Sequence, residues 1–443
     1  MNQAVSLSVS HHFWRYLYTF ILLLLLPFYL ALNFKKLRAG DTNKLSANRS
    51  FLERFGRLPD GADSASVLFH CVSVGEVNAA AKLIQRILEE YPEHKILLTT
   101  SSVTGAYHAQ QVFSDKVIHG FLPMDIPLVM NRFIARIPLK LVCITEVEIW
   151  PNMLNACWKK NIPVCLLNAR MSDNSLSTYK RLSKVFRPAL RKFSYIFAQN
   201  QSSYENFLSL GLFKSQVRLS KNMKFDVKKE VEDDAKAQCL RKYFVLENKK
   251  VLVCASSHDP EEKMLLSCFS SLKTTHPELA LIVVPRHPHR FDEVFELCKA
   301  SGWRTSRYTS HSDRHGMLSS GTEADILLLD VMGWLKAAYA AGDYAFIGGS
   351  FADKGGHNAL ECAVYCKPML MGPSIFNNPT ICQQLAQYGA LSIVDSQEAL
   401  DETLATWIDN PNTAFTAGKS SQQVLQSNTG AVDDTLAVLS ELL

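Results

Sequence analysis

Short apolar runs alternate with longer segments of mixed polarity along most of the chain. In the first half the runs are SVLFHC, KILLTT, KLVCIT, PVCLLNA and YIFAQN; in the second they are KVLVCAS, ALIVVPR, DILLLD, YAFIGGS, PMLMGP and ALSIVD. Continuous apolar strands separated by helix-length amphipathic segments are typical of a parallel sheet that helices cover on both faces. The pattern therefore predicts a doubly wound α/β fold.

The alternation stops between residues 215 and 248, where KNMKFDVKKEVEDDAKAQ is polar and charged. We interpret this stretch as a linker with a solvated helix. It separates an N-terminal Rossmann-like domain over residues 45–222 from a C-terminal Rossmann-like domain over residues 223–443. Ligands of doubly wound sheets bind beyond the carboxyl ends of the strands, so we expect a cleft between two facing domains.

The N-terminal segment follows another pattern. Residues 16–34 contain no charge, and as a helix they would extend about 28 Å, which is enough to cross a bilayer. Basic residues follow within 35–38, whereas Arg15 precedes the run, so the positive-inside rule places the rest of the chain in the cytoplasm. We expect a single transmembrane anchor over residues 13–36. A cleaved signal peptide is the alternative, although the site after the run lacks the small-residue pattern.

Composition narrows the function. The formal net charge of +5 suits an anionic membrane surface or phosphorylated ligands and is too small to indicate nucleic acid. The eleven cysteines are scattered singly, mostly inside apolar runs, which favours buried thiols in a reducing compartment. Zinc-ligand spacing, G-x-G-x-x-G, the P-loop motif and D-x-D are all absent from the sequence. We therefore expect no metal and no cofactor, and any phosphate must be held by protein groups.

The stretch FHCVSVGEVNAA places a carboxylate at the start of a helix. Ser73 and Glu76 fit the capping box S-x-x-E, in which each side chain satisfies a backbone N–H of the first turn. The same position would suit a catalytic base. The local sequence leaves both interpretations open.

A second acidic motif, ITEVEIWPN, places Glu146 and Glu148 at the end of an expected strand. In extended geometry the two side chains share a face. Carboxylates so close raise the pKa of one of them unless a cation intervenes, and Lys224 in KNMKFD is a candidate for that cation. Ordinary surface charge is the alternative for each residue.

Two motifs of the second half suit a phosphate. In YAFIGGSFADKGGHNALE a strand is followed by Gly355 and Gly356 and by the start of a helix, where backbone N–H groups can approach an anion. Glu361, one turn into that helix, could bind a ribose diol. Arg286 follows the strand ALIVV and could bind phosphate with its guanidinium fork. The alternatives are a glycine turn with an Asn358/Glu361 cap, and an arginine that binds loop carbonyls.

Ten motifs along the chain occur in the order typical of one protein family. ERFGRLP, HCVSVGEV, TEVEIWPN, LLNARMSDNS, KNMKFD, SSHDPEE, VPRHPHRF, DVMGWL, GGSFADKGGHNALE and KPMLMGP occur in that order between residues 53 and 373. The chain resembles the 3-deoxy-D-manno-octulosonic acid (Kdo) transferases of lipopolysaccharide synthesis, which have the GT-B glycosyltransferase fold.

The resemblance implies a reaction. Kdo passes from CMP-Kdo to the 6'-hydroxyl of a lipid A precursor, with inversion and without a metal, at the cytoplasmic face of the inner membrane. Glu76 matches the general base, and Glu146 and Lys224 match groups that steady the transition state. The CMP site is expected at Pro285, Arg286, Met332, Gly333, Trp334, Asn358, Ala359, Leu360 and Glu361, beside Gly355 and Gly356.

Departures from the family pattern leave alternatives. Trp334 stands where the family usually has a glutamate, so a small polar contact has become a large apolar one. A GT-B transferase with another CMP-ulosonate or a UDP-sugar donor is one rival function. A membrane-tethered nucleotide-binding protein without activity is the other, and the presence of Glu76, Glu146, Lys224 and Arg286 together opposes it.

Overall fold

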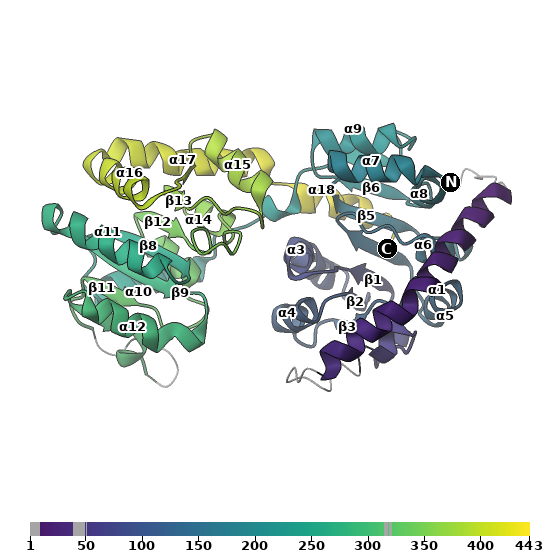
Figure 1. The fold of residues 1–443 in the computed structure, drawn as a ribbon, viewed down its shortest axis with the longest axis horizontal. Coiled ribbons are helices and arrows are strands. Elements are labelled where there is room, and N and C mark those ends of the chain that lie inside the picture. The colour runs from purple at the N-terminus through teal and green to yellow at the C-terminus, as the bar shows by residue number, and fades with distance from the viewer. Residues whose placement is uncertain (1–8, 39–48, 50, 314–317, 319–320) are drawn as a thin grey trace. The chain divides into compact units, whose positions relative to one another are not determined.

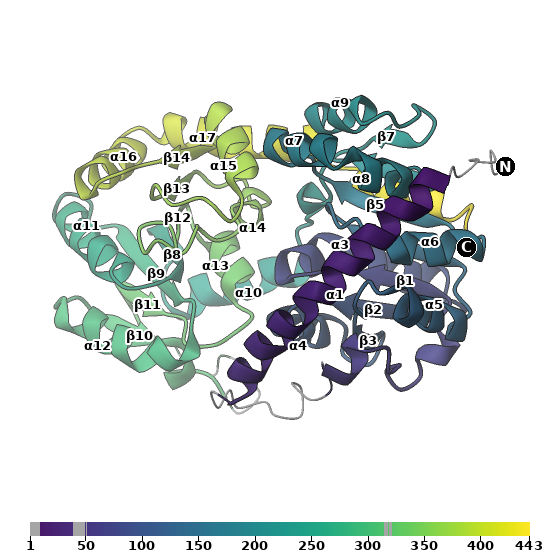
Figure 2. The same cartoon turned by 45° about the vertical axis from the view of Figure 1, so that its right-hand side comes forward.

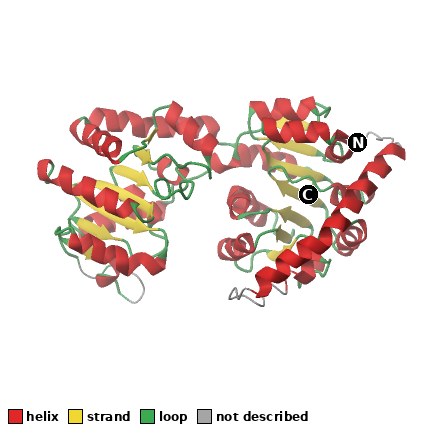
Figure 3. Ribbon diagram, viewed as in Figure 1, coloured by secondary structure: helices red, strands yellow, loops and turns green. Residues whose placement is uncertain are grey.

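The computed structural model describes residues 9–38, 49, 51–313, 318 and 321–443, without the side chains of residues 9–11 and 29–38. The described chain forms two compact units (Figure 1). The N-terminal unit contains the chain up to Asp226 together with Thr429–Leu443, and the C-terminal unit contains Val227–Asn428. In each unit helices flank a central sheet (Figure 3).

The N-terminal unit is built on a seven-stranded sheet in the order β3-β2-β1-β4-β5-β6-β7, with every neighbouring pair parallel. Its strands are β1 Val67–His70, β2 Ile96–Thr100, β3 Ile118–Phe121, β4 Leu141–Thr145, β5 Val164–Ala169, β6 Tyr195–Ala198 and β7 Val217–Leu219. Its helices are α1 Val9–Arg38, α3 Val74–Glu90, α4 Val103–Phe113, α5 Pro127–Arg136, α6 Pro151–Lys159, α7 Asp173–Arg181, α8 Ser183–Leu190, α9 Gln201–Ser209 and α18 Ala431–Leu439, with the 3-10 turns η1 Ala62–Ser64 and η2 Met223–Phe225.

Both faces of this sheet are covered, which explains the unbroken apolar strands. Val67 and Phe69 of β1 belong to one hydrophobic core, and Leu68 between them belongs to the other. This is the two-residue period of a strand with helices on both sides. Helix α18 contributes Leu436 to the first of these cores, so the end of the chain returns to the N-terminal unit. The sequence analysis assigned that segment to the C-terminal domain.

The C-terminal unit repeats the plan with a seven-stranded parallel sheet in the order β10-β11-β9-β8-β12-β13-β14. Its strands are β8 Lys250–Ser257, β9 Leu279–Pro285, β10 Thr305–Arg307, β11 Ile326–Leu328, β12 Tyr344–Ile347, β13 Met369–Met371 and β14 Leu391–Ile393. Its helices are α10 Val231–Tyr243, α11 Glu261–Thr275, α12 Phe291–Ala300, α13 Leu335–Ala341, α14 Leu360–Ala363, α15 Pro379–Gln387, α16 Gln397–Asp409 and α17 Pro411–Asn428, with the turns η3 Pro288–Arg290 and η4 Tyr308–Ser310.

Each sheet has a point where the strand order reverses. In the N-terminal unit the chain winds outward from β1 to β3 and then restarts on the other side with β4. In the C-terminal unit the corresponding pair is β8 and β12. Loops that leave such a pair of strands diverge to opposite faces and open a crevice at the carboxyl edge, where ligands of this fold bind. The two switch points therefore mark where sites are to be sought.

Every apolar run named above is a strand, which confirms the doubly wound fold. The pattern missed β3, β7 and β10, and each of these is short and only partly buried, with polar residues such as His119, Arg218 and Thr305. An edge strand covered on one face does not need a continuous apolar sequence. The polar stretch after residue 215 contains β7, η2 and α10, and α10 packs against α13 within the C-terminal unit.

The N-terminal segment is helical, but it does not match the expected anchor. Within the residues that the structure describes, no helix combines the length and apolarity needed to cross a membrane. The side chains of the last third of the expected span, residues 29–36, lie outside the description. The first half of α1 packs against α8 of the N-terminal unit (Figure 2). The structure thus does not support the single-span anchor that we predicted.

Candidate active site

Glu76 lies at the switch point of the N-terminal sheet. Strand β1 ends at His70, and α3 begins at Val74 after Ser73 as N-cap. The Glu76 side chain is 6% exposed. Its Oε2 accepts hydrogen bonds from the Val72 N–H at 2.8 Å and from the Thr145 hydroxyl at 2.7 Å. Thr145 is the last residue of β4, so this carboxylate joins the loops that follow the two central strands.

The capping-box interpretation is wrong. The Ser73 side chain accepts no hydrogen bond from the first turn of α3. Its hydroxyl instead donates to Glu76 Oε1 at 3.3 Å, and Glu76 binds the N–H of Val72, one residue before the N-cap. Glu76 is therefore held by the strand-end loops and does not serve the cap, and its catalytic role stays a prediction.

Burial sets the protonation behaviour of Glu76. It raises the pKa of this carboxyl above its ordinary value, while hydrogen bonds from Thr145 and Val72 act in the opposite direction. Desolvation has the larger effect. A raised pKa makes the carboxylate a stronger proton acceptor near neutral pH. Oε1 has only the long contact with Ser73, so it is the oxygen with capacity for another partner.

Glu146 and Lys224 form the expected ion pair, with Nζ 3.4 Å from Oε1. Both side chains are partly exposed. Glu146 has a φ of 55°, in the left-handed region that a side chain seldom adopts. It therefore does not continue the extended strand, so the shared face that we predicted for Glu146 and Glu148 is wrong. Strain of this kind is common at functional sites.

Glu148 is the carboxyl whose pKa is raised, as predicted for one of two neighbouring carboxylates. Burial, with the charges of Glu76 and Glu146, raises the pKa of Glu148 to about 7. Glu146 has a lysine partner and Glu148 has a buried environment, so the two acids differ although they are two residues apart. The carboxyl edge at β1 and β4 thus holds three acids: Glu76 and Glu148, each with a raised pKa, and Glu146 with its lysine partner.

Asn168 positions Lys224, and sequence reasoning missed it. Its side-chain oxygen accepts the Met223 N–H at 3.1 Å, and Asn222 accepts the Lys224 N–H at 3.0 Å. These bonds hold η2, which carries Lys224, against the end of β5. Asn168 also has a positive φ, of 49°. An asparagine directly after the apolar run VCLL was the available signal, because asparagine tolerates the left-handed region better than most residues.

The glycine motif of the C-terminal unit lies at the β8/β12 switch point, but its N–H groups are not free for an anion. Gly355 N donates to the Ser374 hydroxyl and Gly356 N to the Gly349 carbonyl. Gly349 N donates to Glu261 Oε2. These glycines serve close packing: a Cβ at Gly348 would come within 2.5 Å of the Ser256 carbonyl oxygen. The proposed cradle of glycine N–H groups is therefore wrong for this conformation.

Glu261 organises this edge and was not singled out from the sequence. The side chain is fully buried, and its two oxygens accept four backbone N–H groups. One comes from His258, after β8, and three come from Gly349, Ser350 and Phe351, after β12, at 2.8 to 3.0 Å. A single carboxylate thus ties the two loops of the switch point together.

Arg286 and a group of histidines supply the polar surface beside this loop. Arg286 follows β9 and is exposed. Its backbone N–H donates to the Ser257 carbonyl. His258 and His357 stack with their Nε2 atoms 2.9 Å apart. Burial and the neighbouring positive groups lower the pKa of each to about 4, so both are neutral at pH 7. The edge therefore combines the Arg286 guanidinium with the neutral imidazoles of His258 and His357.

The remaining expected CMP contacts lie on neighbouring loops. Asn358 accepts the Leu360 N–H and donates to the Glu361 carboxylate, but the N-cap of α14 is Ala359, without a side-chain cap, so the predicted Asn358/Glu361 cap does not form. Burial raises the pKa of Glu361. Trp334 precedes α13, with its ring 4.5 Å from that of Tyr308. Met332, Gly333, Pro285 and Ala359 complete the set, and Gly333 has a φ of 85°.

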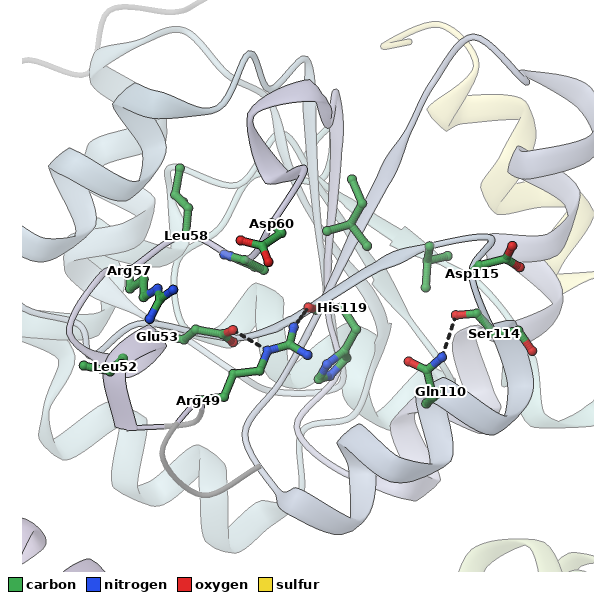
Figure 4. A pocket seen from close by; sticks show the side chains of 13 residues that line it. Arg49, Leu52, Glu53, Arg57, Leu58, Asp60, Gln110, Ser114, Asp115 and His119 are labelled. Carbon is green, nitrogen blue, oxygen red and sulfur yellow. Dashed lines mark hydrogen bonds and ion pairs between the residues drawn. The ribbon is translucent and has the colours of Figure 1, made fainter. Parts of the chain in front are cut away.

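A cavity of about 600 Å³ lies elsewhere, beside β3 (Figure 4). Arg49 binds Glu53 at 2.6 Å there, and Glu53 also accepts the Phe121 N–H. Its lining is Arg49, Leu52, Glu53, Arg57, Leu58, Pro59, Asp60, Gln110, Ser114, Asp115, Val117, Ile118 and His119. None of the predicted site residues is among them, so this cavity is separate from both switch points.

The fold and the two edges define a two-domain α/β protein of the GT-B type. UDP-GlcNAc 2-epimerase from Neisseria meningitidis, solved bound to UDP-GlcNAc, has the same fold with a TM-score of 0.50 and 14% identity, over 82% of this chain and 98% of that one. The C-terminal CMP-Kdo binding domain of WaaA from Acinetobacter baumannii is 34% identical over 44% of this chain and all of that one, with a TM-score of 0.40.

The sequence comparisons identify the family. A family model described as 3-deoxy-D-manno-octulosonic-acid transferase matches residues 49–227. The Kdo transferase of Haemophilus influenzae is 30% identical over 433 residues, 97% of this chain and 99% of that protein. That of Bordetella pertussis is 29% identical over 92% of this chain and 94% of that protein. The chain belongs to the Kdo transferase family and is a glycosyltransferase, which confirms the resemblance.

Proposed function

We propose that the enzyme transfers Kdo from CMP-Kdo to a lipid A precursor, with inversion at the anomeric carbon. The CMP-Kdo binding domain of Acinetobacter baumannii WaaA, 34% identical over 44% of this chain, supports the donor. The observation that carries the mechanism is Glu76, buried at the β1/β4 switch point with a raised pKa and one oxygen, Oε1, held only by a long contact.

Glu76 acts as the general base. As the acceptor hydroxyl attacks the anomeric carbon of Kdo, its proton passes to Oε1 of Glu76. The bond between that carbon and the CMP phosphate oxygen breaks at the same time, and its electron pair leaves with CMP. Attack opposite to the departing phosphate gives inversion. Thr145 and Val72 keep the carboxylate in place throughout, since both bind the other oxygen.

The C-terminal unit binds the donor. Arg286 offsets the charge that grows on the departing phosphate, which is the largest electrostatic demand of the reaction. His258 and His357, neutral at pH 7, supply N–H donors and acceptors beside it. Asn358 and Glu361 contact the ribose, and Met332, Gly333 and Trp334 contact the nucleotide. Ala359 and Leu360 connect Asn358 to Glu361.

The ion pair of Glu146 and Lys224 steadies the reacting sugar. A positive charge develops on the sugar ring as the donor bond breaks, and the Glu146 carboxylate is oriented to balance it by Lys224.

The enzyme works at the cytoplasmic face of the inner membrane, where the acyl chains of its acceptor are anchored. Support comes from α1, whose outer side carries exposed apolar residues, among them Phe20, Leu24 and Phe28. Exposed apolar patches of this extent mark membrane or protein contacts. Flotation of the protein with vesicles of anionic lipid tests this location; protein that stays in the aqueous fraction rejects it.

The decisive test of the activity uses purified enzyme, a tetra-acylated lipid A precursor and candidate donors. Mass spectrometry of the glycolipid after incubation with CMP-Kdo should show the mass of added Kdo. The released nucleotide should be CMP, with no release of UDP from UDP-sugars. Transfer from a UDP-sugar alone would favour the rival donor, and no transfer from any donor would favour the inactive binding protein.

A further inference from the structure

Helix α1 has an inverted pattern of polarity. The inward stripe, at the spacing of successive helical turns, is Arg15, Tyr18, Thr19, Leu22 and Leu26, and its first three members are polar. The outward positions are Phe13, Tyr16, Phe20, Ile21, Leu23, Leu24, Leu25 and Phe28, each between 45% and 66% exposed. A surface helix in water has the opposite arrangement. Polar side chains directed into the protein with apolar ones outside are typical of a helix that faces lipid.

The inward stripe is fixed by a buried hydrogen-bond network, which we call the latch: Arg15, Tyr18 and Thr19 of α1 with Asp125 and Asn152. Arg15 Nη1 donates to Asn152 Oδ1 at 3.0 Å, and Asn152 Nδ2 donates to the Thr19 hydroxyl at 3.0 Å. The Tyr18 hydroxyl bonds to Asp125. Arg15, Thr19, Asn152 and Asp125 are all less than 9% exposed.

The latch reaches the catalytic edge through Asn152. This residue is the second of α6, which begins directly after the loop that carries Glu146 and Glu148. Asp125, after β3, accepts the backbone N–H groups of both Asn152 and Met153, at 2.9 and 2.8 Å. Asp125 thus holds the first turn of α6, and Arg15 and Thr19 attach α1 to Asn152 in that turn, next to the end of the acidic loop.

A cationic surface adjoins α1. Helices α7 and α8 carry Lys180, Arg181, Lys184 and Arg187, all exposed, and residues 174–204 contain no aspartate or glutamate. Helix α8 packs against α1, and the Lys184 ammonium lies 4.9 Å from the centre of the Trp14 ring. An apolar face bordered by cations complements a glycolipid that carries acyl chains and phosphate groups.

We propose that α1 is the acyl-chain wall of the acceptor site and that Arg15 and Thr19 are positioning residues for the glycolipid acceptor. The latch holds the outward apolar face of α1 at a fixed place beside the acidic loop. An acyl chain of the acceptor lies along that face, and its sugar hydroxyl is thereby presented at the edge where Glu76 lies. This inference rests on the proposed function, since it concerns the same acceptor.

Two variants test the latch with the full-length enzyme. Arg15→Met removes the guanidinium, and Thr19→Val removes the hydroxyl that Asn152 binds while it keeps the shape. Arg132→Met, at an exposed position of α5, and Thr406→Val, whose hydroxyl donates one turn back in its own helix as that of Thr19 does, are the matched controls. Kdo transfer is measured to the acylated precursor, with vesicles in excess so that all enzyme is bound, and to its deacylated, water-soluble analogue.

We expect each latch variant to raise KM for the acylated acceptor about tenfold, the factor that corresponds to one lost hydrogen bond. KM for CMP-Kdo and kcat/KM for the deacylated analogue should stay at the wild-type values, as should all parameters of the controls. An equal loss with both acceptors would show a merely structural role and overturn the proposal. So would an unchanged KM under these conditions, which would assign α1 to contact with bulk lipid. Wild-type enzyme that transfers Kdo to neither acceptor would instead reject the proposed function.

Discussion

The two units use one plan for opposite chemistry. Each has a seven-stranded parallel sheet, and each places its functional loops at the pair of strands where the order reverses. At β1 and β4 these loops hold carboxylates, two of them with raised pKa. At β8 and β12 they hold His258 and His357, which are neutral at pH 7, and Arg286 lies beside them after β9. The sheet decides where a site lies, and the loops decide its charge.

Each edge also has a buried group that joins its two loops, and the groups differ in use. Glu261 spends all its accepting capacity on four backbone N–H groups, so it can only position. Glu76 bridges the other pair with Oε2 and keeps Oε1 with a single long contact. A carboxylate with a spare oxygen can take a proton from substrate, and one without cannot. The comparison therefore separates an acid that can only position the backbone from one that has an oxygen able to accept a proton.

The largest effect should come from Glu76→Gln. The amide has the shape of the carboxylate but cannot accept the acceptor's proton, so kcat should fall by about 10³-fold, within the range for loss of a general base. Initial rates of CMP release at saturating substrates measure it, with the thermal unfolding midpoint as a control for folding. A kcat within a few-fold of wild type would remove Glu76 from the chemistry.

Next comes Arg286→Met, which acts on the donor edge alone. Loss of a charge-assisted contact to phosphate should raise KM for CMP-Kdo by about 30-fold, equivalent to about 2 kcal/mol. The acceptor KM should not change. Steady-state kinetics with each substrate varied in turn distinguish the two edges. An equal rise in both KM values would contradict the division of labour.

Glu261→Gln tests the positioning acid. An amide nitrogen in place of one oxygen cannot accept hydrogen bonds from the backbone N–H groups that it would face. The variant should therefore lose about 3 kcal/mol of unfolding free energy. Denaturant unfolding of wild type and variant provides this value, with Glu293→Gln on the exposed side of α12 as the control. CMP affinity, from calorimetry, should weaken while the pH dependence of the rate stays unchanged. A shifted pH profile would mean that Glu261 takes part in proton transfer.

The smallest effect should come from Thr145→Val. The Thr145 hydroxyl lowers the pKa of Glu76 by binding its ionised form, so its removal should raise that pKa further. A base works when deprotonated, so the acid limb of kcat/KM should move to higher pH. The rate should fall severalfold on the acid side and recover at alkaline pH. An acid limb that stays in place, or moves to lower pH, would contradict this assignment.

The sequence predicted the architecture better than the details of the site. Apolar runs located the central strands because these are buried on both faces, while β3, β7 and β10 at less covered positions left no such signal. The ion pair of Glu146 and Lys224 could be predicted because two neighbouring carboxylates favour a nearby cation. The bonding of Glu76 to Thr145 did not, because it depends on two strands that are distant in sequence and adjacent in space.

One error has a clear physical origin. The glycine loop appeared ready for phosphate because sequence shows which backbone groups are permissive but not which already have partners, as Gly356 does. Hydropathy over residues 16–34 likewise does not reveal that Arg15 and Thr19 bind Asn152. Both cases concern hydrogen bonds that form only after folding.

The central claim is that the carboxylate of residue 76 takes the proton of the acceptor hydroxyl. The most direct measurement is the pH dependence of single-turnover Kdo transfer by wild-type enzyme and by Glu76→Gln. Wild type should show a rate that rises with pH to a plateau, along a limb that reports one ionisation, whereas the variant should be slow and lack that limb. The same limb in both proteins would show that another group is the base and would contradict the account.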